Sequence, residues 1–375
     1  PYEYSIRLMV EYHDTVAAED KWFQIDEALS GSSQVAWGDY DHDGWDDLMT
    51  NGPTLYRNNG DGTFENVTTA AGLDGLSSSG VLWGDYDNDG CLDFFGMYSG
   101  NSGPDILVHS NCDGTFTDVT EASGIDDTQE DIDCNADGEP EHSPTPGAAW
   151  VDVDSDGYLD LYLANYECSD PYDFYQDRLF RNNGDGTFAD WSEDHGLTGM
   201  NLAGRGVSPL DVDRDGDMDI FVSNYRLTQN LMYENLDGDQ MANRAAAWGV
   251  AGVWISGAYG HTIGSAWIDL ENDGDWDLIE ANLAHPRYYH FSDLTQVLRN
   301  DGGQTFEDIT VDAGIHYRET HSNPTVQDFD NDGDQDLFVT CVYDGRFSEM
   351  YFNDGTGTFD QVNYESGAVI HNGWG

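Results

Sequence analysis

Acidic residues recur in this chain at a spacing that could bind a metal ion. The stretch "DYDHDGWDD" begins at Asp39 and holds five aspartates in nine residues. Like charges at this density repel one another, so we expect a cation to compensate them. The same pattern, with acidic residues at positions 1, 3, 5 and 9 and glycine at position 6, begins again at Asp85, Asp152, Asp211, Asp269 and Asp328.

This spacing suits a loop that wraps around a hard cation. The side chains of positions 1, 3 and 5 can point inward, glycine at position 6 permits a sharp turn, position 7 offers its backbone carbonyl, and position 9 adds a carboxylate. Oxygen ligands on a flexible loop suit calcium better than zinc or octahedral magnesium. Solvated acidic turns are the alternative, and six matches in one phase argue against that alternative.

We therefore predict six structural calcium sites, whose binding is coupled to folding. Position 7 uses only a main-chain oxygen, so its residue type is free to vary. The predicted ligands are Asp39, Asp41, Asp43, Trp45 and Asp47; Asp85, Asp87, Asp89, Cys91 and Asp93; Asp152, Asp154, Asp156, Tyr158 and Asp160; Asp211, Asp213, Asp215, Asp217 and Asp219; Asp269, Glu271, Asp273, Asp275 and Asp277; and Asp328, Asp330, Asp332, Asp334 and Asp336.

Two places depart from the regular pattern. Glu271 stands in the fifth loop where the other loops have aspartate, and we expect its longer side chain to loosen that site. A weaker match, "DCNADGEPE", lies in an insertion over residues 126–146. It would hold a seventh calcium ion through Asp133, Asn135, Asp137 and Glu141.

Short strand patterns flank each acidic loop. In the third unit "GAAWV" precedes the loop, "DLYLAN" follows it, and "RLFRN" leads through the turn "NGDGTF" to a fourth apolar segment. Asp-Gly between apolar runs predicts a hairpin, and radial repetition of four-stranded units predicts an all-β propeller. We expect one domain over residues 1–375, with repeat units at about 32–73, 74–125, 147–197, 204–250, 263–315 and 322–368.

Both ends of the chain resemble parts of a further unit. "FQIDEALSG" at residues 23–31 is typical of a fourth strand, and the final "HNGWG" resembles a first strand. We expect residues 1–31 and 369–375 to form a seventh blade that both termini share, with a trimmed start and a native chain that continues past Gly375. A ring of six blades is the alternative.

Charge and cysteine content narrow the function classes. The formal net charge is -60, with 13 basic against 73 acidic residues, which argues against binding of nucleic acid or anionic lipid through a basic surface. No apolar run approaches the roughly 18 residues of a membrane span. Among five cysteines we predict the disulfides Cys91–Cys112 and Cys134–Cys168, and hence an oxidising compartment; five buried thiols are the alternative.

The paired motifs resemble those of a known repeat family. "WGDYDNDGCLD" from Trp83 and "RNNGDGTF" from Arg181 are similar to FG-GAP/VCBS repeats, which occur in integrin alpha-subunit propellers and in the cartilage acidic protein family. The resemblance implies a secreted propeller of seven blades, with calcium in the loops that join the first two strands of each blade.

The connections at the other face carry rings, histidines and arginines. Such groups at the mouth of a propeller suit a sugar or an anionic ligand, although each could instead serve only to pack strand ends. The candidate ligand-binding residues are His142, Arg205, Tyr259, His261, Arg287, Tyr288, His321 and His371.

Three functions remain open from the sequence. The leading one is a secreted, calcium-stabilised recognition or adhesion module that binds a glycan or an extracellular protein on the face opposite the calcium loops. The second is a polysaccharide lyase with His261 or Tyr259 as base and Arg205 or Arg287 as the uronate clamp. The third is a structural subunit of a surface layer or filament, which would assemble into oligomers.

Overall fold

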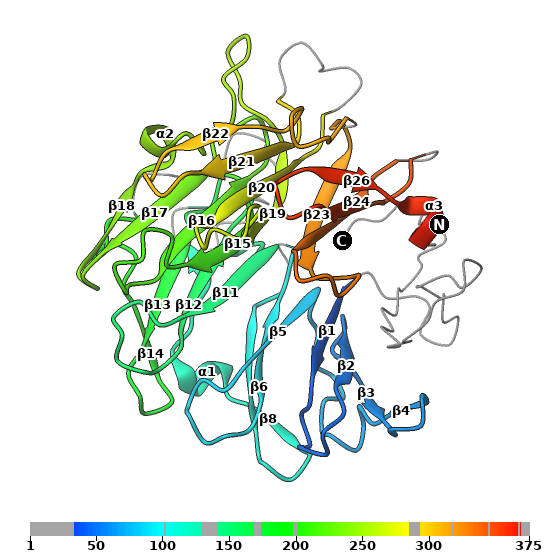
Figure 1. Ribbon diagram of the computed structural model, residues 1–375. Coiled ribbons are helices and arrows are strands. Elements are labelled where there is room, and N and C mark those ends of the chain that lie inside the picture. Colours follow the sequence, from blue (N-terminus) through cyan, green and yellow to red (C-terminus); the bar gives the residue numbers. More distant parts are fainter. Residues whose placement is uncertain are drawn as a thin grey trace.

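Six four-stranded antiparallel sheets follow one another around a ring in chain order (Figure 1). This computed structural model describes residues 34–100, 103–129, 132, 141–168, 174–197, 202–284, 293–316, 318–343, 346–366 and 368. Every sheet keeps its strands in sequence order, so each blade is a simple meander.

The first three blades lie in the first half of the chain. Blade 1 contains β1 (Val35–Gly38), β2 (Asp47–Thr50), β3 (Thr54–Asn58) and β4 (Phe64–Asn66). Blade 2 contains β5 (Gly80–Gly84), β6 (Asp93–Met97), β7 (Ile106–Ser110) and β8 (Phe116–Asp118). Blade 3 contains β11 (Gly147–Val151), β12 (Asp160–Ala164), β13 (Arg178–Asn182) and β14 (Phe188–Asp190).

The second half of the chain forms the other three blades. Blade 4 contains β15 (Gly204–Leu210), β16 (Asp219–Asn224), β17 (Leu231–Leu236) and β18 (Gln240–Asn243). Blade 5 contains β19 (Thr262–Ile268), β20 (Asp277–Asn282), β21 (Gln296–Asn300) and β22 (Phe306–Asp308). Blade 6 contains β23 (His321–Gln327), β24 (Asp336–Cys341), β25 (Glu349–Asn353) and β26 (Phe359–Gln361).

Small elements complete the described chain. A two-stranded ribbon, β9 (Thr128–Gln129) with β10 (Glu141–His142), lies between blades 2 and 3. The helices are single turns: α1 (Thr120–Ser123), α2 (Ala245–Trp248) and α3 (Asn363–Ser366). Within the described residues, no helix has the length and apolarity that a membrane crossing requires.

Neighbouring blades share their hydrophobic cores. The core between blades 3 and 4 contains Tyr162 and Leu179 from one blade and Val222 and Tyr233 from the next. Equivalent clusters join blades 1 and 2, 2 and 3, 4 and 5, and 5 and 6. Because a short-stranded blade has little interior of its own, this burial between blades supplies most of the apolar stabilisation.

The first strand of each blade lies next to the first strand of the following blade, so these strands line the centre of the ring. Tryptophans pack between the first strands of some adjacent blades. Trp150 lies so close to Gly84 that a Cβ on this glycine would come within 2.5 Å of the indole Nε1. Trp267 donates through Nε1 to the carbonyl of Ser208 at 3.1 Å, which joins blade 5 to blade 4.

The all-β propeller predicted from the repeats is confirmed, and the described residues form six blades. Each sheet lies along one of the six repeat units expected from the sequence, although β19 and β23 begin one residue earlier than the expected bounds of 263 and 322. The closing blade predicted from residues 1–31 and 369–375 lies outside the described residues, so the six-bladed alternative matches what is described.

Candidate metal centres and the opposite face

The six acidic loops join the first and second strands of each blade and therefore lie at one end of the propeller. The predicted sharp turn at position 6 is present in every loop, with φ between 87° and 105°. Such angles favour glycine, which has no Cβ. Position 4 is also left-handed, although no copy has glycine there: His42, Asn88, Ser155, Arg214, Asn272 and Asn331 have φ between 55° and 61°.

The carboxylate at position 1 fixes this turn. In all six loops its Oδ2 accepts a hydrogen bond from the N–H of the glycine at position 6, for example from Gly157 to Asp152 at 3.0 Å. The carboxylate at position 5 accepts the N–H of position 7, as Asp156 does from Tyr158 at 2.9 Å. Backbone N–H groups thus fix the conformation of each loop, and the carboxylate oxygens keep further lone pairs that can bind a cation.

The carboxylate at position 9 is buried in every loop, at 0% to 1% exposure. Its Oδ2 accepts the N–H of position 2, and its Oδ1 accepts an N–H at the end of the third strand. In blade 3 these bonds reach Asp160 from Val153 at 2.9 Å and from Asn182 at 2.7 Å. Position 9 therefore anchors the loop to the blade as well as facing the other acids.

Burial shifts the protonation of these anchors. It raises the pKa of the buried carboxyls against the opposing effect of their backbone N–H donors. The pKa rises to about 6 for Asp47 and Asp336 and to about 7 for Asp93, Asp160, Asp219 and Asp277. A bound divalent cation would favour the ionised form and so offset the cost of burial.

The loop side chains converge enough to hold a metal ion. Ligand atoms lie within 4.8 Å of one another in clusters that include Asp39, Asp41 and Asp43; Asp85, Asp87 and Asp93; and Asp152, Asp154 and Asp160. Arg181 neutralises part of the third cluster, with Nε 2.7 Å from Asp154 and Nη2 2.8 Å from Asp156. Oδ1 of Asp154 and Oδ1 of Asp211 are nevertheless buried without a hydrogen-bond partner in the described structure, as metal ligands would be.

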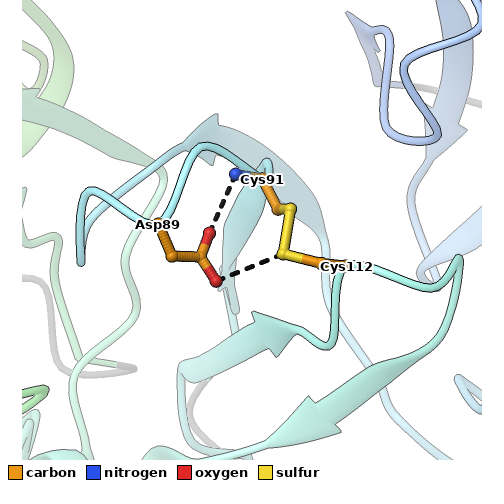
Figure 2. Close-up of side chains that lie close together, drawn as sticks. All are labelled: Asp89, Cys91 and Cys112. Carbon is orange, nitrogen blue, oxygen red and sulfur yellow. Dashed lines mark hydrogen bonds between the residues drawn. A yellow bond between two sulfur atoms is a disulfide. The ribbon is translucent and has the colours of Figure 1, made fainter.

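The side chain at position 7 packs against the hairpin between the third and fourth strands. A Cβ on Gly60 would lie 2.8 Å from Trp45, and one on Gly184 would lie 2.8 Å from Tyr158. In blade 2 a covalent bond replaces this packing, because Cys91 and Cys112 form a disulfide (Figure 2).

The predicted pairing of Cys91 with Cys112 is thus confirmed. Asp89 lies beside it: its Oδ1 accepts the N–H of Cys91 at 2.8 Å, and its Oδ2 is 3.3 Å from Sγ of Cys112 (Figure 2). Cys168 is also disulfide-bonded, Cys341 is a buried free thiol, and Cys134, the predicted partner of Cys168, lies outside the described residues.

An asparagine at the end of the third strand links neighbouring loops, a role that the sequence analysis did not assign. Asn182 donates through Nδ2 to the carbonyl of Tyr86 in the loop of the preceding blade at 2.7 Å. Asn235 does the same to Val153 at 2.8 Å. Because Asn182 and Asn235 also donate their backbone N–H to position 9, they connect the loops of blades 2, 3 and 4 into one hydrogen-bonded rim. The dipeptides "RN", "EN" and "FN", which recur before the hairpin turns, are the sequence pattern that could have indicated this role.

The candidate seventh loop lies mostly outside the described residues. Asp133, Asn135 and Asp137 lie outside the described residues, and Glu141 begins strand β10. The seventh site stays a prediction.

The candidate ligand-binding residues at the opposite end have different surroundings. His142 is half-exposed, and its Nδ1 lies 2.6 Å from Oδ1 of the buried Asp127. His321 is buried between Thr295 and Glu349, at 2.9 Å and 3.2 Å. These contacts are those of histidines that hold strands together.

The remaining candidates separate into two groups. Tyr259 packs edge-on against the exposed Trp254, with ring centroids 4.9 Å apart. His261 is buried, and its ring centroid lies 4.3 Å from that of Tyr225, a ring that Arg205 also contacts. Arg287, Tyr288 and His371 lie outside the described residues, so the clamp that Arg287 would form in a lyase has no described geometry.

Arg205 is the centre of a cluster formed by blades 3 and 4. Its guanidinium lies over the rings of Tyr166, at 4.4 Å, and Tyr225, at 5.2 Å. Arg226 approaches the same two rings at 6.0 Å and 5.6 Å, and its Nε donates to Glu167 at 2.7 Å. Cation–π contacts of this kind hold arginines in place without neutralising them.

Backbone bonds position the two tyrosines of this cluster. The N–H of Tyr166 donates to the carbonyl of Pro144 at 2.9 Å, and that of Tyr225 donates to Ala203 at 2.8 Å. Burial raises the pKa of Tyr225, a shift that Tyr166 reinforces and the guanidinium groups oppose. Sequence reasoning missed Tyr225, Arg226 and Glu167; the signal was "NYE" and "NYR", which follow the second strands of units 3 and 4 in the same phase.

Comparisons with known proteins agree with the repeat architecture. The sequence profile of the FG-GAP-like repeat matches residues 39–96 and 144–222. Human cartilage acidic protein 1 is 28% identical over 163 residues, which is 43% of this chain and 24% of the human protein. The mouse protein of the same name is 27% identical over 163 residues, again 24% of its length. The match thus spans about a quarter of these relatives.

A solved structure supports the fold alone. A Bacteroides uniformis protein described as a candidate 6-phosphogluconolactonase superposes with a TM-score of 0.52 at 12% identity, over 93% of this chain and 89% of that protein. Identity this low carries no information on activity. The repeats, the blades and the shared segment together lead to one conclusion: the chain is a β-propeller with two segments that match the FG-GAP-like repeat, and part of it is homologous to part of cartilage acidic protein 1.

Proposed function

We propose that this chain is an extracellular recognition module whose acidic loops bind calcium to hold the propeller together. In this proposal a glycan or an extracellular protein binds at the end opposite the calcium loops. The Cys91–Cys112 disulfide fits an oxidising compartment, and part of the chain is similar to proteins named cartilage acidic protein 1. Oxygen-only donors in flexible nine-residue loops favour calcium over zinc and magnesium.

One observation carries the recognition part of the proposal. The acidic loops of all six blades lie at one end of the ring, whereas the Tyr166–Arg205–Tyr225 cluster lies at the other end. Tyrosine rings that hold an uncompensated arginine charge are the side-chain chemistry of ligand recognition rather than of sheet packing. A scaffold that needed only stability would gain little from that arrangement.

An array experiment tests this proposal. The calcium-loaded chain is applied to panels of glycans and extracellular proteins, alongside Arg205→Gln at the opposite end and Arg57→Gln at the calcium end. Arg57 is a matched control, because it is an exposed arginine on β3 whose Nη2 contacts Glu65 at 2.6 Å. We expect a saturable ligand whose binding is weakened by Arg205→Gln and retained by Arg57→Gln. A ligand lost only in Arg57→Gln, or no ligand on either panel, would contradict the proposal.

A further inference from the structure

We propose that the Tyr166–Arg205–Tyr225–Arg226 cluster binds a single oxyanion, a carboxylate or a sulfate, carried by an acidic sugar. This inference rests on the proposed function, because it names the ligand class for the face opposite the acidic loops. Its starting point is charge. The cluster combines two guanidinium groups with one carboxylate, that of Glu167, and so carries one net positive charge in a chain of formal charge -60.

Arg205 is the uncompensated member of the cluster. Within the described residues it forms no ion pair, whereas eight other arginines contact carboxylates. Its charge is held against two tyrosine faces instead. A guanidinium stacked on a ring keeps the N–H groups in its plane available, and two parallel N–H donors match the oxygens of a carboxylate or sulfate.

Arg226 is positioned to assist. Its ion pair with the nearly buried Glu167 fixes one edge of the guanidinium, while 46% of the side chain stays exposed to solvent. Arg226 and Leu227 both adopt left-handed backbone angles, with φ of 58° and 62°. Residues with a side chain adopt these angles at a cost, which indicates that the position of this turn is under constraint.

The single net positive charge of the cluster favours a sugar with one acidic group over a polyanion. A ligand with many negative charges would be repelled by the surrounding acidic surface, while a single oxyanion needs only the local charge, since screening limits longer-range repulsion to roughly 8 Å at physiological salt. Tyr166 and Tyr225 add ring edges and hydroxyl groups, which suit the C–H faces and hydroxyls of a pyranose.

Titration calorimetry with defined sugars tests this inference. The probes are glucuronic acid and galactose 6-sulfate, with glucose and galactose as neutral counterparts and a short oligo-aspartate peptide as the competing class. The full calcium-loaded chain is compared with Arg205→Gln, Arg226→Gln and Arg244→Gln. Arg244 is the control, since it is an exposed arginine whose Nε contacts Glu234 at 2.5 Å on the outer edge of blade 4.

We expect at least one acidic sugar to bind about tenfold more tightly than its neutral counterpart, in line with a charge-assisted hydrogen bond. Arg205→Gln should reduce that affinity about tenfold, and Arg244→Gln should leave it unchanged. Equal affinity for neutral and acidic sugars, an affinity that Arg205→Gln leaves intact, a preference for oligo-aspartate, or no binding of either acidic sugar would overturn the inference. If the arrays still yield a neutral glycan or a protein, the recognition proposal survives while this ligand class fails. Matching thermal melts of all variants establish that they are folded.

Discussion

The two ends of the propeller are built in different ways. At one end the same hydrogen bonds recur in all six loops, from the N–H of position 6 to position 1 and from that of position 2 to position 9. At the other end the candidate ligand-binding residues have individual surroundings: His142 pairs with Asp127, His321 with Thr295, and Arg205 lies against two tyrosines. Hydrogen bonds that recur in every blade indicate a structural requirement of the blade. Contacts that occur in one blade alone indicate positions that can differ without loss of the fold, and such positions are available for ligand binding.

Coupling also differs between the ends. Asn182 connects the loop of blade 3 to that of blade 2, and Arg214 of the fourth loop lies 2.9 Å from Asp275 of the fifth. Disturbance of one loop should therefore spread along the rim. Removal of a charge from the Arg205 cluster should stay local, because its contacts are ring stacking and one ion pair.

Calcium removal should cause the largest loss of stability, and this loss should arise at the acidic end. At about 2 mM free calcium, dissociation constants of about 10⁻⁴ to 10⁻³ M give about 1–2 kcal/mol per site, or on the order of 10 kcal/mol for six sites. We expect a chelator to lower the melting temperature steeply, as followed by tryptophan fluorescence. Magnesium at the same concentration is the control and should restore little. An unchanged melt in chelator would remove calcium from the account of this fold.

Loss of the Cys91–Cys112 disulfide should cause the next largest loss of stability. It closes a segment with a sequence separation of 21, so the double variant Cys91→Ser, Cys112→Ser should lose about 3 kcal/mol of unfolding free energy. Urea unfolding in excess calcium measures this loss. Cys341→Ala, which removes a buried sulfur outside any disulfide, serves as the comparison. A double variant as stable as the parent would mean that packing at position 7 suffices without the covalent link.

Asp160→Asn should cost about 2 kcal/mol, somewhat less than the disulfide. An amide at this buried position would lose an acceptor for the N–H of Val153 or Asn182 and would set its own N–H groups against those donors. Asp312→Asn, which changes an exposed aspartate, should alter stability by less than about 0.5 kcal/mol. Equal urea midpoints for the two variants would show that position 9 does not anchor the loop.

Arg205→Gln should have the smallest effect on stability. Loss of its cation–π contacts should cost about 1 kcal/mol or less, while the affinity for an acidic sugar falls about tenfold. Thermal melts and calorimetry on one preparation separate the two quantities. A stability loss as large as that of Asp160→Asn would show that Arg205 is a structural residue. It would contradict the division into a structural acidic end and a ligand-binding opposite end.

Much of the acidic end could be predicted from sequence because each loop is built from nine consecutive residues. The positions of the carboxylates, the turn at Gly157 and its equivalents, and the Cys91–Cys112 bond all follow from spacing within a repeat. The bond from Asn182 to Tyr86 could not be predicted in the same way, since it joins residues in different blades. Only the distance between adjacent blades decides whether that bond forms.

The amino-acid sequence by itself determined the repeat, the four-stranded blades and the acidic loops, because these depend on the order of neighbouring residues and on their backbone preferences. The tertiary structure alone decided that Tyr166, Arg205 and Tyr225 meet. Tyr166 follows β12, whereas Arg205 and Tyr225 belong to the next blade, and only the shared core between blades 3 and 4 brings them into contact. The physical reason is burial: apolar faces of two blades must pack together, and that packing sets which polar groups meet at the rim.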